Sequence, residues 1–348
     1  MICRECKKEK ILSKTLPYCP DCLRRDFKKL LPEIIEIHQK TRIDFHLPEK
    51  IPRNPNGIAC GMCINNCRII EGGTGYCGVR KNIGGKIIGP GEDWAYVDWY
   101  HDPLPTNCVA DWVCEGSRDY GYKNLAVFYE ACTFNCLFCQ NWHYRQRKNR
   151  ATVQELAGAA DALTSCICYF GGDPTPFARH SIATSREILE RKRYKKFRIC
   201  WETNGSISPE LMKEWIELAL ISNGCIKIDF KTFSEELNIA LCGASNKNTK
   251  ENIKLLAKNM FKREQPPLLV VSTLLIPGYI DEYEIREMAK FLSSINEHIP
   301  WSFLGFYPHF YFQDLPQTSR KEAQQALQIA RNFRITNTHI GNIHLLID

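Results

Sequence analysis

One short segment of the chain carries three cysteines at a spacing that suits metal chemistry. Cys132, Cys136 and Cys139 follow a Cys-x3-Cys-x2-Cys pattern, so a single loop can present three thiolates. A cubane 4Fe-4S cluster takes four ligands. Three cysteines therefore leave one iron open, much as a catalytic metal site keeps one position for its substrate. The spacing suits an open iron–sulfur cluster, and the position of the loop in the fold decides whether it is catalytic.

The elements that must position this loop alternate from about residue 125 onward, where short apolar runs are separated by segments with helical periodicity. The predicted strands are Leu125–Tyr129, Ile167–Phe170, Phe197–Trp201, Cys225–Phe230, Leu268–Leu274 and Ser302–Tyr307, with Ile343–Ile347 as an extra candidate. The predicted helices are Val153–Leu163, Pro209–Ile221, Thr249–Phe261, Asp281–Ile295 and Arg320–Phe333. This alternation predicts an α/β fold with a parallel sheet, in the form of a partial (β/α)6 TIM-like barrel. A doubly wound open sheet is the alternative.

Polar or backbone-exposing residues follow the predicted strands at the point where each strand ends. The segments are Gly171–Pro176, Glu202–Gly205, Asp229–Lys231 and Ile276–Gly278. Each one alone suits an ordinary βα turn, since Gly, Pro, Asn and Asp belong in turns for steric reasons. Because the chemistry of a parallel barrel sits at the carboxyl ends of its strands, we expect these segments and the cysteine loop to share one site.

These motifs resemble those of the radical S-adenosylmethionine (SAM) superfamily. The three cysteines fit its signature, including the aromatic Phe138 before the last cysteine. The segment Gly171-Gly172-Asp173-Pro174 resembles the Gly-Gly-Glu-Pro segment of that superfamily. The segment Ile228-Asp-Phe-Lys-Thr232 resembles a motif of the subgroup related to pyruvate formate-lyase activating enzyme. Within that subgroup, the chain is most similar to an uncharacterised branch. The resemblance covers roughly residue 57 to the C-terminus.

The resemblance implies a reductive cleavage of SAM. An electron passes from the 4Fe-4S cluster to SAM bound at the open iron, and gives methionine and a 5′-deoxyadenosyl radical that abstracts hydrogen from a substrate. An electron donor such as flavodoxin or ferredoxin is the implied partner. The substrate, a protein or a small molecule, is not implied, and a role as a glycyl-radical enzyme activase would be one form of this chemistry.

The resemblance also implies which residues hold SAM. The backbone of Gly171 and Gly172 would receive its amino group, with Asp173 one methylene shorter than the usual Glu. Asp229 and Lys231 would hold its polar groups, and Asn204 would assist. Gly278 would offer backbone to the adenine, and His309 would approach the nucleoside, although its place after Tyr307-Pro308 matches only loosely.

Two further groups of four cysteines precede this region. Cys3, Cys6, Cys19 and Cys22 form a Cys-x2-Cys-x12-Cys-x2-Cys pattern, typical of zinc ribbons, with iron as the alternative metal. Four thiolates close a coordination sphere, so the expected role is structural. Cys60, Cys63, Cys67 and Cys77 form the second group among glycines, and zinc and a second iron–sulfur cluster are equally good occupants.

The remaining cysteines carry weaker expectations. Cys108 and Cys114 either lie near the second group or are free thiols. The predicted strands contain Cys166, Cys168, Cys200 and Cys225, and we expect these four, together with Cys242, to act as small buried hydrophobic side chains.

Composition limits the other possibilities. The 348 residues include 18 cysteines, an unusual number for a cytosolic protein in which disulfides are rare, and we expect metal binding in the cytoplasm. No apolar stretch approaches the length of a membrane span, so we expect no membrane association. The net charge of +7 is mild and dispersed, and permits a nucleic-acid partner without arguing for one.

We expect three parts: residues 1–40 as a zinc-ribbon-like module with a helix, residues 41–124 as a cysteine-rich extension and linker, and residues 125–348 as the barrel. The leading functional hypothesis is a radical SAM enzyme. The alternatives are a non-catalytic iron–sulfur or zinc protein, or an electron carrier, and a nucleic-acid modifying enzyme that uses the ribbon as a clamp.

Overall fold

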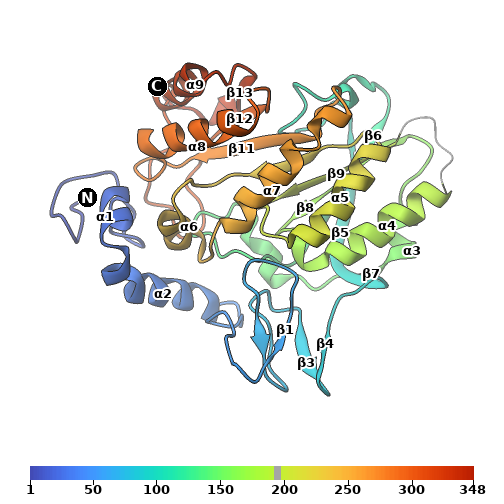
Figure 1. The fold of residues 1–348 in the computed structure, drawn as a ribbon, viewed down its shortest axis with the longest axis horizontal. Coiled ribbons are helices and arrows are strands. Elements are labelled where there is room, and N and C mark those ends of the chain that lie inside the picture. The colour runs from blue at the N-terminus through green and yellow to red at the C-terminus, as the bar shows by residue number, and fades with distance from the viewer. Residues whose placement is uncertain (192–196) are drawn as a thin grey trace.

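The centre of the molecule is a nine-stranded sheet, seen in a computed structural model that describes residues 1–191 and 197–348 (Figure 1). The strands lie in the order β13-β12-β11-β10-β9-β8-β6-β5-β7. The ladder from β6 to β13 is parallel, whereas β5 pairs antiparallel with β6 and β7. The bounds are β5 Trp94–Pro103, β6 Lys123–Tyr129, β7 Arg150–Thr152, β8 Thr164–Gly171, β9 Arg198–Thr203, β10 Ile226–Asp229, β11 Leu269–Leu275, β12 Trp301–Gly305 and β13 Thr338–Gly341.

Helices connect the parallel strands and begin at side chains that cap them. Ser319 and Glu322 form a reciprocal capping box at the start of α9, and Asp281 accepts a bond from Glu284 N at the start of α8. The α-helices are α1 Pro20–Arg25, α2 Phe27–Ile43, α3 Val153–Gly158, α4 Ala178–Arg191, α5 Pro209–Ile221, α6 Glu235–Cys242, α7 Lys247–Ala257, α8 Glu282–Ile295 and α9 Arg320–Asn332. Short 3-10 turns lie at η1 Glu115–Arg118, η2 Trp142–Gln146, η3 Thr175–Phe177, η4 Met260–Lys262 and η5 Ile343–Leu345.

The order of the parallel strands follows the order of the chain without reversal, from β6 through β8 to β13. A doubly wound sheet reverses its strand order at a switch point, so that alternative is wrong, and the α/β prediction with one consecutive parallel sheet is confirmed. Figure 1 shows α4, α5 and α7 across one side of the sheet, as right-handed connections in a constant direction require.

Some elements differ from the sequence prediction. The last strand is Thr338–Gly341, and Ile343–Leu345 is a 3-10 turn where a strand was expected. The helix from Val153 ends at Gly158, five residues early. Sequence patterns also missed α4, α6 and β5; β5 adds ten residues of the cysteine-rich extension to the central sheet.

Alternate side chains of the central strands point to opposite faces of the sheet. The side chains on one face of these strands are apolar and pack with Trp215 of α5 in the main core. They are Ile167, Tyr169, Ile199, Trp201, Ile226 and Ile228. The other face, called the inner face below, carries polar and sulfur-containing residues, which are Cys166, Cys168, Arg198, Cys200, Glu202, Lys227 and Asp229. The helices therefore cover an ordinary core, and the opposite face is available for chemistry.

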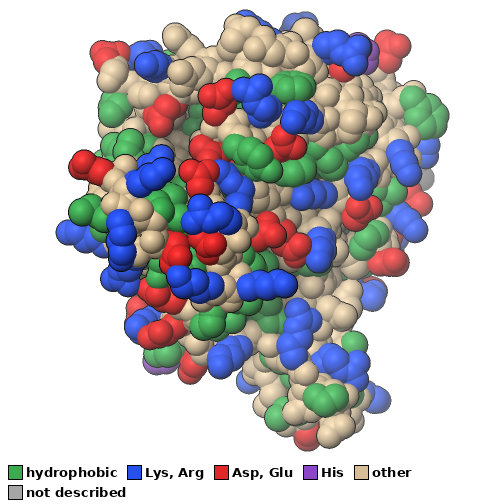
Figure 2. All heavy atoms as spheres, turned by 60° about the vertical axis from the view of Figure 1, so that its left-hand side comes forward, with side chains coloured by type: hydrophobic (Ala, Val, Ile, Leu, Met, Phe, Trp, Pro, Cys, Tyr) green, Lys and Arg blue, Asp and Glu red, His purple; other side chains and the backbone are tan. Residues whose placement is uncertain are grey.

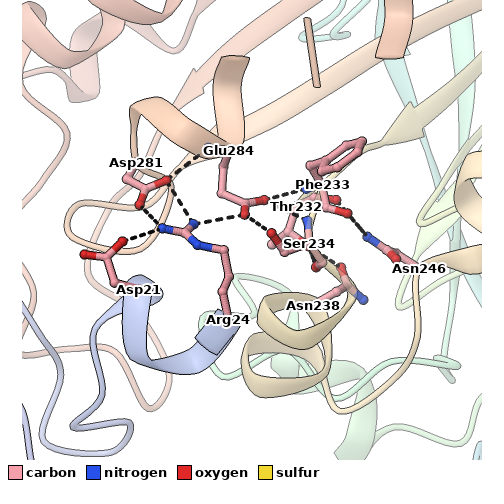
Figure 3. A network of polar contacts seen from close by, with 9 residues as sticks. All are labelled: Asp21, Arg24, Thr232, Phe233, Ser234, Asn238, Asn246, Asp281 and Glu284. Carbon is pink, nitrogen blue, oxygen red and sulfur yellow. Dashed lines mark hydrogen bonds and ion pairs between the residues drawn. The ribbon is translucent and has the colours of Figure 1, made fainter. Parts of the chain in front are cut away.

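The N-terminal module contacts the barrel through an ionic network in which Glu284 is buried and the other charged groups are partly exposed (Figure 3). Arg24 of α1 contacts Asp21 at 2.8 Å, Asp281 at 2.7 Å and Glu284 at 3.1 Å. Glu284 is fully buried and also accepts a bond of 2.6 Å from the backbone N–H of Phe233. The module is thus tied to the start of α8 and to the loop that follows β10.

Short hairpins make up the lower part of the molecule in Figure 1. They are formed by β1 Ile58–Ala59 with β2 Arg68–Ile69, and by β3 Lys81–Ile83 with β4 Lys86–Ile88. On the face drawn in Figure 2, basic and acidic side chains are interspersed. Among the helices in the described part of the chain, none is both long and apolar enough to cross a membrane.

Candidate active site

A cavity opens at the carboxyl ends of the parallel strands, where the sequence predicts the site. Its volume is about 180 Å³. The predicted residues that line it are Cys132, Cys136, Cys139, Gly171, Gly172, Asp173, Asn204, Asp229 and Lys231. The structure therefore brings together nine of the eleven residues predicted for this site, from four different strand ends.

The cysteine loop follows β6 directly and is fixed by backbone bonds to α6. Asn135 N donates to Cys242 O at 2.7 Å, and Leu137 N donates to Leu241 O at 3.0 Å. The thiol of Cys242 contacts that of Cys136, and this contact, followed by burial, raises the pKa of Cys136 well above its ordinary value. Cys242 was expected to be only a buried apolar side chain, and it is a direct neighbour of the loop.

Burial also raises the pKa of Cys132 well above the ordinary value and that of Cys139 to about 11. The free loop is therefore a set of neutral thiols at pH 7. Because a metal binds the thiolate, loading this loop must release protons.

Two consecutive glycines bring the end of β8 against the start of the cysteine loop. Gly172 N donates to Tyr129 O at 2.8 Å. A Cβ at Gly171, which has φ +108°, would lie 2.5 Å from Tyr129 N, and one at Gly172 would lie 2.4 Å from Ala131 O. No side chain fits at either position, so the glycines are required by this approach of two backbones.

Asp173 links two strand ends, those of β8 and β9, through its buried carboxylate. It accepts bonds from Thr175 N at 2.8 Å, Asn204 N at 2.8 Å and Thr203 Oγ1 at 3.0 Å. Burial raises the pKa of this carboxyl, and the hydrogen bonds act in the opposite direction. A shorter side chain than Glu thus serves here to hold the site together.

Asn204 and Lys231 approach the cavity from neighbouring strands. Asn204 Nδ2 donates to Thr133 Oγ1 at 3.0 Å and lies 3.8 Å from Cys132 Sγ. Lys231 Nζ lies 3.0 Å from Asp229 Oδ2. Burial lowers the pKa of Lys231, but Asp229 and Cys136 raise it by a larger amount, so the net direction is upward and Lys231 is a cation. The cavity therefore presents a fixed ammonium and carboxylate pair.

Arg145 supplies a test of whether an iron–sulfur cluster fits this loop. Arg145 is 6% exposed, and its Nη1 donates to Asn135 Oδ1 at 2.8 Å. Its Nε and Nη2 have no hydrogen-bond partner among the described residues. Burial lowers the pKa of Arg145, but Tyr144 and the three cysteines raise it by more. A buried cation with free donors beside three thiols suits a group that carries negative charge, as a thiolate-ligated cluster does.

Two predicted residues do not line the cavity. A Cβ on Gly278 would lie 2.0 Å from Ile11 O, so the N-terminal module packs directly on this glycine. His309 lies before Phe312, whose N–H donates to His309 O at 2.9 Å. The cavity residues, all in the described part of the chain, include neither of them.

The N-terminal cysteines converge as a compact tetrad. The Sγ atoms of Cys3, Cys6, Cys19 and Cys22 all lie within 4.8 Å of one another. Tetrahedral zinc with bonds of about 2.3 Å places its sulfurs at such separations. Burial raises the pKa of Cys3, but the N–H groups of Cys6 and Cys19 lower it by more, to about 6. This cluster of four can bind one metal ion; its identity as zinc stays a prediction.

The second group of four cysteines also converges. Cys60, Cys63, Cys67 and Cys77 line one small cavity of about 20 Å³ together with Arg80. Burial raises the pKa of Cys60, Cys63 and Cys67. These sulfurs do not form a set as close as the N-terminal tetrad within the described chain. The group therefore has the ligands for a metal centre, and the metal stays a prediction.

The structure reassigns Cys108 and Cys114. They lie against Cys168 and Cys200 on the inner face of the sheet, and not beside the second group. The four strand cysteines are buried or half-buried as expected, but three of them line a second cavity next to the candidate site. Sequence reasoning missed this cavity and Arg145; the alternation of Cys166 and Cys168 along one strand is the signal that could have found the cavity.

Residues 126–292 match the family model of the radical SAM superfamily. Among curated proteins, an uncharacterized protein of Methanocaldococcus jannaschii is 25% identical over 306 residues, covering 83% of this chain and 82% of its own length. The pyruvate formate-lyase 1-activating enzyme of Escherichia coli K12 is 22% identical over 204 residues, covering 55% of this chain and 78% of the relative.

A solved structure of Streptococcus suis SuiB bound to S-adenosylmethionine aligns with a TM-score of 0.44 and 15% identity. The alignment covers 60% of this chain and 47% of that one.

Proposed function

Starting from the radical SAM domain that this chain contains at residues 126–292, we propose that the protein reductively cleaves SAM to abstract hydrogen from a protein or small-molecule substrate. The observation that supports this most strongly is the convergence of the three-cysteine loop with four predicted polar strand-end residues on one cavity, which are Asp173, Asn204, Asp229 and Lys231. When bound, a 4Fe-4S cluster supplies the electron that breaks a carbon–sulfur bond of SAM.

The chain's own residues have distinct parts in this proposal. Cys132, Cys136 and Cys139 would hold the cluster through their thiolates. The buried cation of Arg145 balances the negative charge that three thiolates bring into a site of low dielectric. Since its free N–H groups are already buried, no reorganisation is needed when a cluster is loaded.

The polar pairs at the strand ends suit the amino-acid part of SAM. Lys231 is a fixed cation and complements a carboxylate, while Asp229 keeps it oriented at 3.0 Å. The carbonyl groups near Gly171 and Gly172 are close enough to the cysteine loop to receive an ammonium. The side-chain amide of Asn204 lies 3.8 Å from Cys132 Sγ and so contacts the cysteine loop.

The comparisons suggest one candidate substrate class. The similarity to pyruvate formate-lyase 1-activating enzyme, at 22% identity, favours the cofactor chemistry, and a glycyl-radical enzyme is the substrate class proposed by analogy. A flavodoxin or a ferredoxin is the proposed electron donor. Zinc in the N-terminal tetrad is proposed as a structural ion.

The test is product formation under anaerobic conditions. The chain is reconstituted with iron and sulfide, then mixed with SAM and dithionite, and 5′-deoxyadenosine is quantified. The native protein should form it, and Cys132→Ala/Cys136→Ala/Cys139→Ala should form none. A fully loaded native protein that makes no product would contradict the proposal.

A second pair of variants tests the SAM residues. Lys231→Met should raise the SAM concentration needed for half-maximal product and lower kcat/KM by roughly 100-fold, since a charge-assisted contact of about 3 kcal/mol is lost. Lys258→Met changes an exposed lysine of the same size and is the matched control. Equal values for both variants would remove Lys231 from the site.

A further inference from the structure

The inner face of the sheet holds a second cavity, of about 270 Å³, next to the candidate active site. Five cysteines line it. Cys166 and Cys168 come from β8, Cys200 comes from β9, and Cys108 and Cys114 come from the segment between β5 and β6. Segments far apart in the sequence therefore bring their thiols to one place.

A sixth cysteine lies directly behind this lining. Cys225, immediately before β10, makes side-chain contacts with Cys114 and with Cys200. Its backbone N–H donates to Cys200 Sγ at 3.3 Å. The sulfurs thus form a connected group and are not isolated replacements for small apolar residues.

The cavity wall is not an ordinary barrel interior. The inside of a parallel barrel is usually filled by layers of branched apolar side chains. Here the inward positions of β8, β9 and β10 carry Cys168, Cys200 and Lys227, while the outward positions carry the apolar core. A set of buried cysteines that served packing alone would close the space around them.

Lys227 places a positive charge among these sulfurs. Its side chain is 2% exposed, and Nζ lies 3.0 Å from Cys168 Sγ, 3.3 Å from Cys108 Sγ and 3.3 Å from Glu202 Oε2. A buried ammonium requires anionic or strongly accepting partners. Glu202 supplies one anionic partner, from a side chain that is 30% exposed. The other two partners are sulfurs, and because neutral thiols accept hydrogen bonds weakly, this lysine suits sulfurs that carry the negative charge of metal-bound thiolates.

We propose that this cavity binds a second iron–sulfur cluster, with ligands drawn from Cys108, Cys114, Cys166, Cys168, Cys200 and Cys225. A single zinc ion is a poorer occupant, because within the described chain these thiols do not gather within 4.8 Å as the N-terminal tetrad does. A cluster of several irons holds its thiolates further apart, and the three cysteines of the candidate active site share that wider arrangement.

The position of this cavity gives the second cluster a place in the chemistry. Asn141, Phe170 and Glu202 line both cavities. A cluster on the inner face would therefore stand beside the space into which a substrate must enter. This second cluster is a separate proposal from SAM cleavage, because the cluster can be present or absent whether or not the cleavage occurs.

The experiment measures iron, sulfide and zinc per chain in anaerobically reconstituted full-length protein. The starting variant is Cys132→Ala/Cys136→Ala/Cys139→Ala, in which the catalytic loop cannot hold a cluster. It should retain iron and acid-labile sulfide, with an electron paramagnetic resonance signal after reduction. A starting variant with no iron, or with zinc and no sulfide, would overturn the proposal.

Two matched pairs assign the retained cluster. Adding Cys168→Ser/Cys200→Ser should remove a full cluster's iron and sulfide, whereas adding Cys60→Ser/Cys67→Ser should leave that portion in place. Iron that is insensitive to the first pair would place the cluster elsewhere and contradict the proposal. Circular dichroism of both variants checks that they fold.

A third variant keeps every thiol of this cavity and tests the same assignment through the charge of Lys227. In the same starting variant, Lys227→Met should change the resonance spectrum and the reduction potential of the retained cluster, because a charge 3.0 Å from one ligand sulfur is removed. Lys258→Met is again the exposed control. An unchanged spectrum with Lys227→Met would overturn the assignment even if the serine variants failed to fold.

Discussion

Two cysteine sites in this molecule use the same ligand for opposite purposes. The N-terminal tetrad gathers four thiols within 4.8 Å of one another and leaves no opening for a substrate. The loop after β6 presents three thiols to a cavity that also contains Asp229 and Lys231. The first site closes a coordination sphere around one ion, and the second keeps its metal accessible.

Their surroundings differ in the same way. Apolar residues around the tetrad, such as Leu16 and Leu23, are buried in a core that they share with the cysteine loop and α6. Arg24 adds ion pairs with Asp281 and Glu284 (Figure 3). The loop is held by backbone bonds to α6 and has a buried cation, Arg145, with unused donors beside it. The comparison indicates that removing one site should affect folding, and removing the other should affect chemistry.

The largest expected effect is loss of the tetrad. Cys19→Ala/Cys22→Ala should unfold residues 1–43, because a structural zinc site contributes on the order of 10 kcal/mol to such a segment. Limited proteolysis should then cut within α2, and metal analysis should show one fewer ion per chain.

The matched variant for this comparison is Cys136→Ala/Cys139→Ala. It should keep residues 1–43 resistant to protease while it abolishes 5′-deoxyadenosine formation. Protease resistance that is unchanged in the tetrad variant would break the comparison, since the tetrad would then have no structural role.

Docking of the module can be separated from its metal. Glu284 is fully buried and accepts bonds from Arg24, Phe233 N and Ser234 N. Glu284→Gln should lower the free energy of unfolding by about 3 kcal/mol, because the fully buried carboxylate is replaced by a neutral amide that accepts these bonds more weakly, while Arg24 keeps Asp21 and Asp281. Denaturant unfolding measures this, with the tetrad metal still bound.

Glu282→Gln is the control for that variant. Glu282 pairs with Arg286 on the surface of α8, and an exposed pair contributes about 0.5 kcal/mol or less. A similar loss of stability in both variants would mean that the network in Figure 3 does not anchor the module.

The reduction potential of a cluster in the loop should depend on the charge of Arg145, whereas metal binding by the tetrad should not. Arg145→Gln should shift the reduction potential of the catalytic cluster to more negative values by on the order of 60 mV, the one-electron equivalent of about 1.4 kcal/mol. The reason is that reduction adds negative charge beside a cation that the variant lacks. Redox titration followed by electron paramagnetic resonance measures the shift.

Arg147→Gln removes an exposed arginine from the same segment and should leave the potential unchanged. Equal shifts for the two variants would show that general charge, and not the buried position of Arg145, sets the potential.

The sequence carried enough information to predict the six main parallel strands and the cysteine loop, because both depend on local patterns: apolar runs in the strands, and spacing in the loop. It could not place Gly278, because the neighbour that covers it, Ile11, lies 267 positions away in the chain. For the same reason, the sequence could not predict the roles of Arg145 and of the inner-face cysteines. Their significance comes from which side of a strand they occupy and from partners in other segments, such as Lys227 against Cys108.

The last expected effect concerns pH and the strand that leads into the loop. His180 Nδ1 lies 2.9 Å from the hydroxyl of Tyr129, near the end of β6, and burial lowers the pKa of His180 to about 4. The unfolded chain binds a proton below about pH 6.5, and the folded chain does so only below about pH 4. The free energy of unfolding should therefore fall as the pH is lowered between these values, by up to roughly 3 kcal/mol for this group.

His180→Gln should flatten part of that decrease in denaturant unfolding measured from pH 7 to pH 5. The buried His38, whose pKa burial also lowers to about 4, keeps its share in the variant. His344→Gln changes an exposed histidine and should follow the native curve. If His180→Gln also followed the native curve, the acid sensitivity would come from His38 and from the metal sites, because protons displace metal from thiolates at both the tetrad and the loop. The comparison between the two sites would then govern stability at low pH as well.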